Sequence, residues 1–287
     1  MYEAYAAGAT APRERPDNPP GVEEGLEGAA RPQALVLRAP GINCERETAL
    51  ACAAAGADTR IVALRELADR PQDLADAGLL VLPGGFAHGD YLGAGALLAA
   101  ELRARLGTAL ERFVDDGGLV LGICNGFQAL ARLGLLPDVA LAPNAHGLFE
   151  CRQVELRAEA ASRCVFTRGL DRFSLPVAHG EGRVVPRDAV TLARLEERGC
   201  VALRYVAPSG ARAGGYPDNP NGSAGAIAGL CNPRGTVLGL MPHPERAALP
   251  RQARDHGDRA DGLPGLRLFA NAVRYLWSTR DAEATYV

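Results

Sequence analysis

Short apolar runs alternate with helical segments through the first half of the chain, and this alternation limits the fold more than any other feature. Strand-like runs at 34–40, 58–64 and 79–85 precede a long helical pattern, and a fourth run at 118–123 leads into a second helix. Strands that alternate with helices form βαβ units, and uninterrupted apolar strands indicate a sheet covered on both faces. We therefore expect an α/β fold with helices on both faces of a mostly parallel sheet.

The pattern changes after Phe149. Strand-like runs then follow one another, joined by Gly, Pro and Asn turns with little helix between them. We expect these runs to be antiparallel additions and hairpins on the same sheet. A helix closes the chain and places Leu266, Phe269 and Val273 on one face.

The sequence predicts one folded α/β domain at residues 34–280. Residues 1–33 are rich in Pro, Gly, Ala and Glu and show no periodicity, so we expect a disordered N-terminal extension. Residues 281–287 are expected to be a C-terminal tail. The polar segment 246–262 contains Gly and Pro and is predicted to be a surface loop.

All 31 basic residues are arginine, because the chain contains no lysine. A Walker A site, a pyridoxal Schiff base and a biotin or lipoyl carrier each need a lysine, so these functions are excluded. The net charge of -3 does not favour nucleic acid or a membrane as a partner. No apolar run approaches the ~20 residues that a membrane span needs. The N-terminus lacks the apolar core of a secretory signal, and we expect a cytoplasmic protein.

Seven cysteines are scattered along the chain with no C-x-x-C pair. Zinc ribbons, iron–sulfur runs and thioredoxin-like motifs are therefore not supported, and we expect no metal site. Single cysteines in such a chain are usually small buried hydrophobic residues. We expect this of all except Cys124.

Cys124 stands in the most informative motif, Gly122-Ile123-Cys124-Asn125-Gly126, between an apolar strand and an amphipathic helix. This is the cysteine counterpart of the G-x-S-x-G nucleophile elbow, in which small flanking residues permit a strained turn. The turn would set the sulfur at the N-terminus of the helix, where free N–H groups favour a thiolate. The motif alone also fits a buried cysteine in a tight turn, but its placement makes Cys124 the predicted nucleophile.

A thiolate enzyme needs a base to move protons. His243 follows an apolar strand in MPHPER, and Glu245 stands two residues later, so both side chains would lie on one face of an extended segment. The carboxylate would then orient the imidazole and stabilise its protonated form. His179, between glycines in PVAHGEGR, is the rival base and also fits the rim of a ligand site.

An acyl-transfer enzyme also has to hold an oxyanion. Gly84 and Gly85 follow a strand end in LPGGFAHGDY, where backbone N–H groups can point at a ligand. We expect the Gly85 N–H and the Asn125 N–H to form the oxyanion hole. A tight turn is the alternative interpretation of the two glycines.

The segments CNGFQ, AHGEGR, YPDNPNGS and MPHPER, taken together, are those of a known family. Over nearly all of residues 34–277 the chain resembles the class I (triad) glutamine amidotransferases, and among them the glutaminase subunits of phosphoribosylformylglycinamidine synthase. The resemblance implies a flavodoxin-like fold and a triad of Cys124, His243 and Glu245. It also implies that Gln128 faces the substrate, together with Gly84 and His179.

The resemblance further implies the reaction and the partners. Glutamine is hydrolysed to glutamate and ammonia, and the ammonia passes to a large synthetase subunit that uses ATP and Mg²⁺. That subunit converts formylglycinamide ribonucleotide to its amidine, and a small third subunit bridges the two. No cofactor is expected on this chain. His88 and Gly93 depart from the family pattern, in which an aromatic residue and an arginine are usual.

Three other functions remain open at this point. A thiol peptidase or hydrolase on the same scaffold would need a pocket for a substrate other than glutamine. A regulatory subunit without chemistry would usually lack one of the catalytic residue types. An amidotransferase could also serve another synthetase, such as those that make GMP, CTP or anthranilate.

Overall fold

The computed structural model describes residues 30–252 and 263–284. The chain divides after Ala30, and the fold described below is that of the unit from Arg31 onward. Most of the predicted N-terminal extension, the end of the predicted loop at 246–262 and the end of the predicted tail at 281–287 lie outside the described residues. The first part of that loop forms two short 3-10 turns, η4 (Pro244–Ala247) and η5 (Pro250–Gln252).

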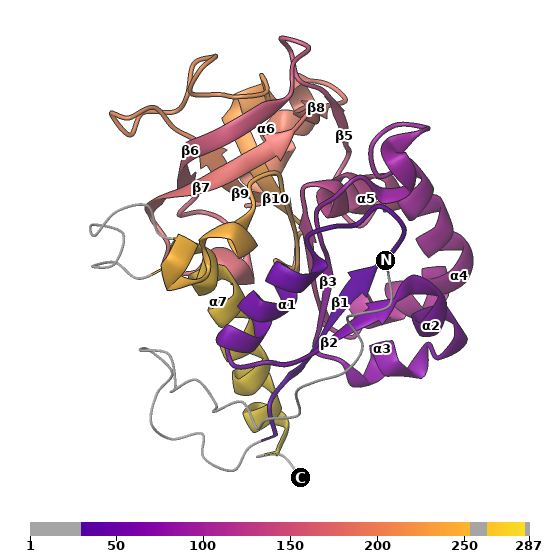
Figure 1. The fold of residues 1–287 in the computed structure, drawn as a ribbon. Helices are drawn as coiled ribbons and strands as arrows, with labels where there is room; N and C mark the ends of the chain where they lie inside the picture. Colours follow the sequence, from indigo (N-terminus) through magenta and orange to yellow (C-terminus); the bar gives the residue numbers. More distant parts are fainter. Residues whose placement is uncertain (1–29, 253–262, 285–287) are drawn as a thin grey trace. The chain divides into compact units, whose positions relative to one another are not determined.

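A nine-stranded sheet runs through the described unit, and five of its strands are parallel (Figure 1). In spatial order the parallel strands are β2 (Asp58–Ala63), β1 (Gln33–Arg38), β3 (Leu79–Leu82), β4 (Leu119–Ile123) and β11 (Val237–Leu240). The order 2-1-3-4 followed by a fifth strand is that of flavodoxin-like folds, in which ligands bind beyond the carboxyl ends of the strands. The predicted fold class is therefore confirmed.

The other four strands of the large sheet are antiparallel: β10 (Ile227–Cys231), β9 (Val201–Tyr205), β6 (Glu150–Ala158) and β7 (Arg172–His179). A separate two-stranded sheet pairs β5 (Val139–Pro143) with β8 (Glu181–Pro186). This half lies above the parallel strands in the view of Figure 1.

Helices cover both faces of the parallel strands. They are α1 (Glu45–Ala54), α2 (Leu64–Asp69), α3 (Gln72–Asp76), α4 (Ala96–Asp115), α5 (Asn125–Leu133) and α7 (Pro264–Ala284). The first and last of these pack together on one face, and α3, α4 and α5 lie on the other (Figure 1). A further helix, α6 (Ala189–Glu197), lies in the second half of the molecule and packs against β8. Fully buried aliphatic side chains such as Leu35, Leu80 and Leu121 fill the space between the layers.

The second half differs from the expectation in three respects. β11 is parallel to β4, because a hairpin reverses the chain after β10 and returns it beside the first half. β8 leaves the large sheet to pair with β5. The helix α6 was not expected, although Asp188 is a recognisable N-cap whose carboxylate accepts a 2.7 Å hydrogen bond from the Thr191 N–H.

The cysteine prediction is right for five of the six residues. Cys151 is exposed, because it points away from the core along β6. In the described part of the chain, none of the helices has both the length and the apolar character that crossing a membrane requires.

Candidate active site

Cys124 lies in a strained turn between β4 and α5. Its backbone has φ 51° and ψ −103°, a left-handed conformation that a residue with a Cβ rarely adopts. A Cβ on Gly126 would overlap the carbonyl oxygen of Leu82, and one on Gly122 would lie 2.5 Å from a methyl carbon of Leu130. The two glycines are thus needed because strand and helix approach so closely, which is the geometry of a nucleophile elbow.

Hydrogen bonds connect the elbow to its surroundings. The Cys124 N–H donates to Leu240 O at 2.8 Å and so joins the end of β4 to the end of β11. The Asn125 side chain accepts from the Ala87 N–H at 2.9 Å and donates to Asp90 Oδ1 at 3.0 Å. The thiol is 5% exposed and points toward Ala178 O, 3.7 Å away on β7. The sulfur is therefore held at the junction of the two halves.

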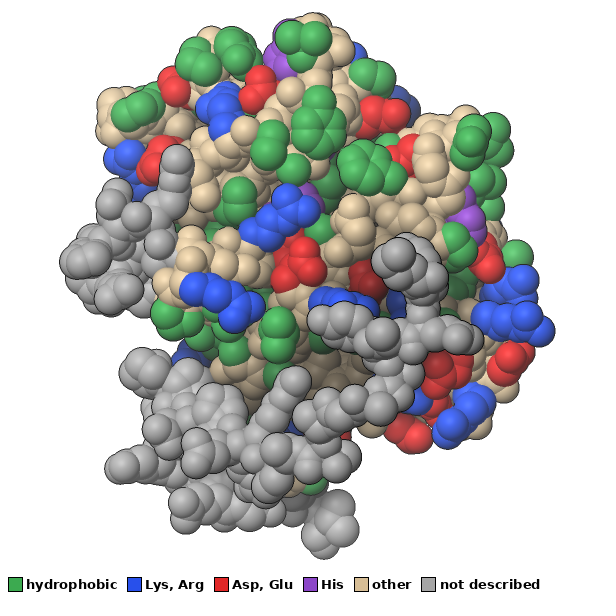
Figure 2. All heavy atoms as spheres, viewed as in Figure 1, with side chains coloured by type: hydrophobic (Ala, Val, Ile, Leu, Met, Phe, Trp, Pro, Cys, Tyr) green, Lys and Arg blue, Asp and Glu red, His purple; other side chains and the backbone are tan. Residues whose placement is uncertain are grey.

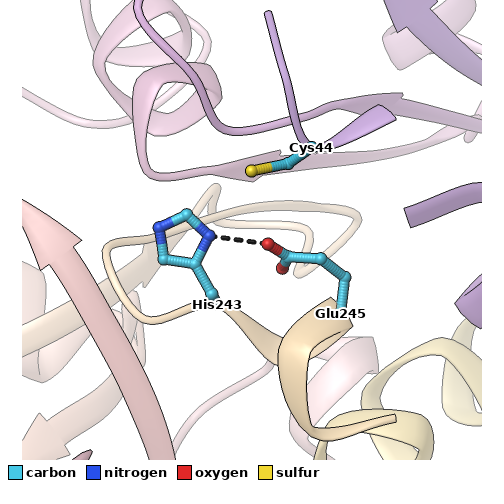
Figure 3. Close-up of side chains that lie close together, drawn as sticks. All are labelled: Cys44, His243 and Glu245. Atoms are coloured by element: carbon cyan, nitrogen blue, oxygen red, sulfur yellow. Dashed lines mark hydrogen bonds and ion pairs between the residues drawn. The ribbon is translucent and has the colours of Figure 1, made fainter. Parts of the chain in front are cut away.

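The predicted base and its carboxylate do meet. His243 Nδ1 and Glu245 Oε1 are 2.6 Å apart, and both side chains are buried (Figure 3). The geometric reason differs from the expected one, because Glu245 stands in the 3-10 turn η4 and not in an extended segment. The other ring nitrogen of His243, Nε2, has no hydrogen-bond partner among the described residues. That atom remains available for a proton transfer.

The charge of the pair favours an imidazolium. Burial by itself lowers the pKa of His243, but the carboxylate of Glu245 and the neighbouring sulfur of Cys124 outweigh burial and raise the pKa well above its usual value. The ring therefore carries a proton at neutral pH. A protonated imidazole beside a thiol can stabilise the thiolate and can later give a proton to a leaving group.

Gly84 and Gly85 follow β3 at the same edge of the sheet. A Cβ on Gly84 would lie 2.7 Å from Cε1 of His243, so this glycine makes room for the imidazole. Gly85 has φ +150°, and a Cβ there would lie 2.7 Å from Ile42 Cα. Its N–H has no hydrogen bond with another described residue, as an oxyanion donor requires. The Asn125 N–H is the first of its helix and has no acceptor within that helix.

Gln128 and His179 are both buried close to the elbow. Gln128 donates to Glu181 O, and its Oε1 accepts from Asn125 Nδ2 at 2.8 Å, so both ends of this amide already have partners. His179 Nδ1 lies 3.1 Å from Asn144 Oδ1. The Asn144 side-chain N–H groups donate to Leu148 O and His179 O, so its Oδ1 must accept a hydrogen bond from His179. Nδ1 of His179 is therefore the protonated nitrogen, and Nε2 is an acceptor.

His179 is the weaker of the two candidate bases. Burial, followed by repulsion from His243, lowers its pKa to about 3, so the ring is neutral at pH 7. Its partner is an amide, whereas that of His243 is a carboxylate. The neutral ring suits a hydrogen bond to a ligand better than proton transfer.

Cys44 is the residue of this site that the sequence did not indicate. It precedes α1, just beyond the carboxyl end of β1, and is 1% exposed. Its sulfur, one ring nitrogen of His243 and one oxygen of Glu245 lie within 4.8 Å of one another (Figure 3). The sequence signal was its place in the segment between a strand end and the next helix, because ligand sites of this fold form there.

Comparison with known proteins agrees with the geometry. The family described as CobB/CobQ-like glutamine amidotransferase domain matches residues 31–276. A phosphoribosylformylglycinamidine synthase subunit PurQ from Dehalococcoides mccartyi is 42% identical over 252 residues, which cover 84% of this chain and 96% of that protein. A PurQ subunit from Methanococcus maripaludis is 40% identical over 266 residues, with 85% and 97% covered.

The structure of PurLQS from Thermotoga maritima also contains a similar chain. It has 35% sequence identity and a TM-score of 0.69, and the match covers 86% of this chain and 100% of that one. With a family match over most of its length and such identities to PurQ subunits, this chain belongs to the CobB/CobQ-like glutamine amidotransferase family, among the phosphoribosylformylglycinamidine synthase subunits PurQ.

Proposed function

We propose that this chain is the glutaminase subunit of phosphoribosylformylglycinamidine synthase and hydrolyses L-glutamine at Cys124. The observation that carries the proposal is the placement of a strained cysteine elbow after β4 and a buried His243–Glu245 pair after the adjacent parallel strand β11. Membership of the PurQ subunits supplies the substrate class and the pathway, de novo purine biosynthesis.

In the first half of the reaction the Cys124 thiolate attacks the carboxamide carbon of glutamine, and the C=O electron pair moves onto oxygen. The N–H groups of Gly85 and Asn125 stabilise that oxyanion; one such donor is typically worth about 10²–10³ in rate. The imidazolium of His243 gives its proton to the departing nitrogen, which leaves as ammonia. A γ-glutamyl thioester on Cys124 remains.

In the second half a water molecule attacks the thioester. His243, now neutral, accepts a proton from the water, and the collapsing intermediate releases glutamate and restores the thiolate. Glu245 holds the ring in the tautomer that directs Nε2 at the reacting atoms. Gln128, Gly84 and the acceptor Nε2 of His179 are proposed to line the place of the glutamine substrate.

The ammonia is proposed to pass to the synthetase subunit, which uses ATP and Mg²⁺ and is joined by a small bridging subunit. Exposed apolar side chains beside the site suit such docking. The rings of Phe86 and Phe149 are 49% and 54% exposed, and their centroids are 6.4 Å apart. Phe86 follows Gly85 in the chain, and Phe149 lies next to Gly180, the residue after His179. Figure 2 shows hydrophobic side chains exposed in the upper part of the view, where β6, β7 and β8 lie in Figure 1.

A partner that covers these side chains would also keep ammonia from solvent, since apolar patches of this kind usually mark interaction sites. We propose the cytoplasm as the compartment, because free glutamine and the nucleotide substrate are available there. We propose no cofactor on this chain.

The test is replacement of Cys124 by Ala in the complex with the synthetase subunit from the same cells. We expect glutamate release to fall by at least about 10⁴-fold, as for other lost nucleophiles, while ammonia-dependent synthesis continues. A diazoketone analogue of glutamine should label wild-type Cys124 and should not label the variant.

Cys151→Ser is the matched control, because Cys151 is exposed and lies outside the elbow. Undiminished glutamate release by the Cys124→Ala complex would overturn the proposed nucleophile. Failure of the analogue to label wild-type Cys124 would favour a different thiol hydrolase.

A further inference from the structure

Three buried side chains from two distant parts of the sequence present zinc-binding atoms to one another. Cys44 follows β1, whereas His243 and Glu245 follow β11. Their sulfur, nitrogen and oxygen atoms lie within 4.8 Å of one another, and all three residues are buried (Figure 3). We propose that Cys44, His243 and Glu245 bind a divalent cation of the zinc class, and that the bound ion inhibits the enzyme.

The distances suit a tetrahedral ion after small movements. Zinc binds sulfur at ~2.3 Å and nitrogen or oxygen at ~2.0–2.2 Å, so its ligand atoms lie roughly 3.3–3.8 Å apart. Nδ1 of His243 and Oε1 of Glu245 are closer than that, at 2.6 Å. The carboxylate would therefore turn to offer Oε2, a buried atom without a hydrogen-bond partner among the described residues. A water molecule would complete the coordination.

The backbone already holds the three residues in place. His243 stands between Pro242 and Pro244, and its N–H donates to Pro176 O at 2.8 Å. The Cys44 N–H donates to Gly84 O at 3.3 Å, and α1 packs against η4. A site whose ligands are held before binding loses little conformational entropy when the ion arrives.

The guanidinium of Arg246 contacts Cys44 and Glu245 and would compete with a metal ion for them. Its Nη2 donates to Cys44 Sγ at 3.1 Å, and its Nε lies 3.6 Å from Glu245 Oε1. The side chain is 36% exposed and can move into solvent when an ion binds. Since like charges repel, Arg246 must weaken the affinity for a metal, and its removal should strengthen binding.

Binding releases protons and stops the chemistry. The Cys44 thiol loses its proton to solvent, and His243 binds the ion through Nδ1 as a neutral ring. Nε2 of that ring then carries the remaining proton and cannot accept another. The inhibitory part of the inference rests on the proposed function, whereas the binding part does not.

The experiment measures zinc affinity of the purified full-length chain by competition with a chromophoric chelator. We expect the wild type to bind a single zinc ion, Cys44→Ser to bind it at least about tenfold more weakly, and Arg246→Ala to bind it more tightly. Co²⁺ in place of zinc should give thiolate-to-cobalt charge-transfer absorption in the wild type and not in Cys44→Ser. Cys151→Ser is the matched control and should match the wild type.

Cys124→Ala tests whether zinc binds at Cys44 or at the proposed nucleophile, and this variant should keep the wild-type zinc affinity. Equal zinc affinities of the wild type and Cys44→Ser would overturn the proposal, as would loss of binding in Cys124→Ala. If Cys44→Ser does not fold, Glu245→Gln and Arg246→Ala should still change the affinity in opposite directions. None of these readouts needs glutaminase activity, so they remain decisive whether or not glutamine is the substrate.

Inhibition is measured on the complex with the synthetase subunit. Glutamate release should fall on zinc addition and return with a chelator. Full activity at zinc concentrations that saturate the binding site would overturn the inhibitory role.

Discussion

The proposed nucleophile and its proposed base come from two regions that are built in different ways. The conformation of Cys124 depends on glycines next to it in the chain, because Gly122 lets α5 approach β4 and Gly126 lets α5 approach Leu82 at the end of β3. His243 is positioned by residues distant in the sequence, including Pro176 O on β7 and Gly84 after β3. A motif can therefore specify the conformation of the nucleophile, whereas the base depends on the whole fold.

The difference has an energetic side as well. The elbow has no spare room, so small changes there meet backbone atoms directly. The surroundings of the base are polar and charged, so changes there should act on proton transfer and pH dependence more than on packing. Three substitutions test this contrast, and a fourth tests the exposed surface beside the site.

Gly126→Ala should have the largest effect, on stability. The new methyl group would overlap the carbonyl oxygen of Leu82 in a strand that cannot move freely, so we expect a loss of more than about 4 kcal/mol or no folded protein. Gly107→Ala is the matched control, since a Cβ there meets nothing within 4 Å in α4; it should stabilise by about 0.5–1 kcal/mol. Urea unfolding measures both, and a mild effect of Gly126→Ala would show that the elbow can relax.

Glu245→Gln should lower kcat by about 10²–10⁴-fold with little change in KM, because an amide can neither orient the ring in the same way nor stabilise its positive charge. Glutaminase kinetics of the synthetase complex measure this. Glu111→Gln, an exposed change on α4, is the control. Unchanged kcat would mean that Glu245 is not needed by the base, and the free energy of unfolding should show whether the variant instead loses packing.

His179→Asn should change the pH dependence of stability. The pKa of His179 is about 3 in the folded protein, whereas in the unfolded chain it is about 6.5. Below pH 6.5 the unfolded chain binds the extra proton, so this residue makes the wild type lose up to about 1.4 kcal/mol per pH unit as the pH falls toward 3. The variant lacks that contribution, and its unfolding free energy should fall less between pH 6.5 and 4.5. Parallel pH profiles of the two proteins would contradict the assignment.

Phe149→Ala should have the smallest effect. The ring is more than half exposed, so the stability of the isolated chain should hardly change, while the affinity for the synthetase subunit should fall by about 1 kcal/mol. Val190→Ala, equally exposed on α6, is the control. A titration of the two subunits measures the affinity, and equal values for both variants would remove Phe149 from the docking surface.

Prediction from the sequence was most successful where the signal is local. The alternation of apolar strands and helices correctly predicted β1 to β4 and the helices α1, α4 and α5, because each of these elements has its own periodicity. The short helices α2 and α3 were not predicted. Prediction was poorer in the second half. The sequence did not predict that β8 pairs with β5, that β11 is parallel to β4, or that α6 forms. Strand partners depend on contacts between segments far apart in the chain, which local patterns do not reveal.

The chain alone determined the kind of chemistry available: a cysteine between small residues at a strand-to-helix turn, a histidine and a carboxylate two residues apart, and no lysine for other cofactors. Only the tertiary structure decided which side chains share the site. It placed Cys44 against His243 and made His179 a neutral buried ring, and both results follow from burial and from distances across the sheet. The physical reason is that covalent neighbours restrict backbone conformation locally, whereas proximity and desolvation arise when the parallel strands bring their carboxyl ends together.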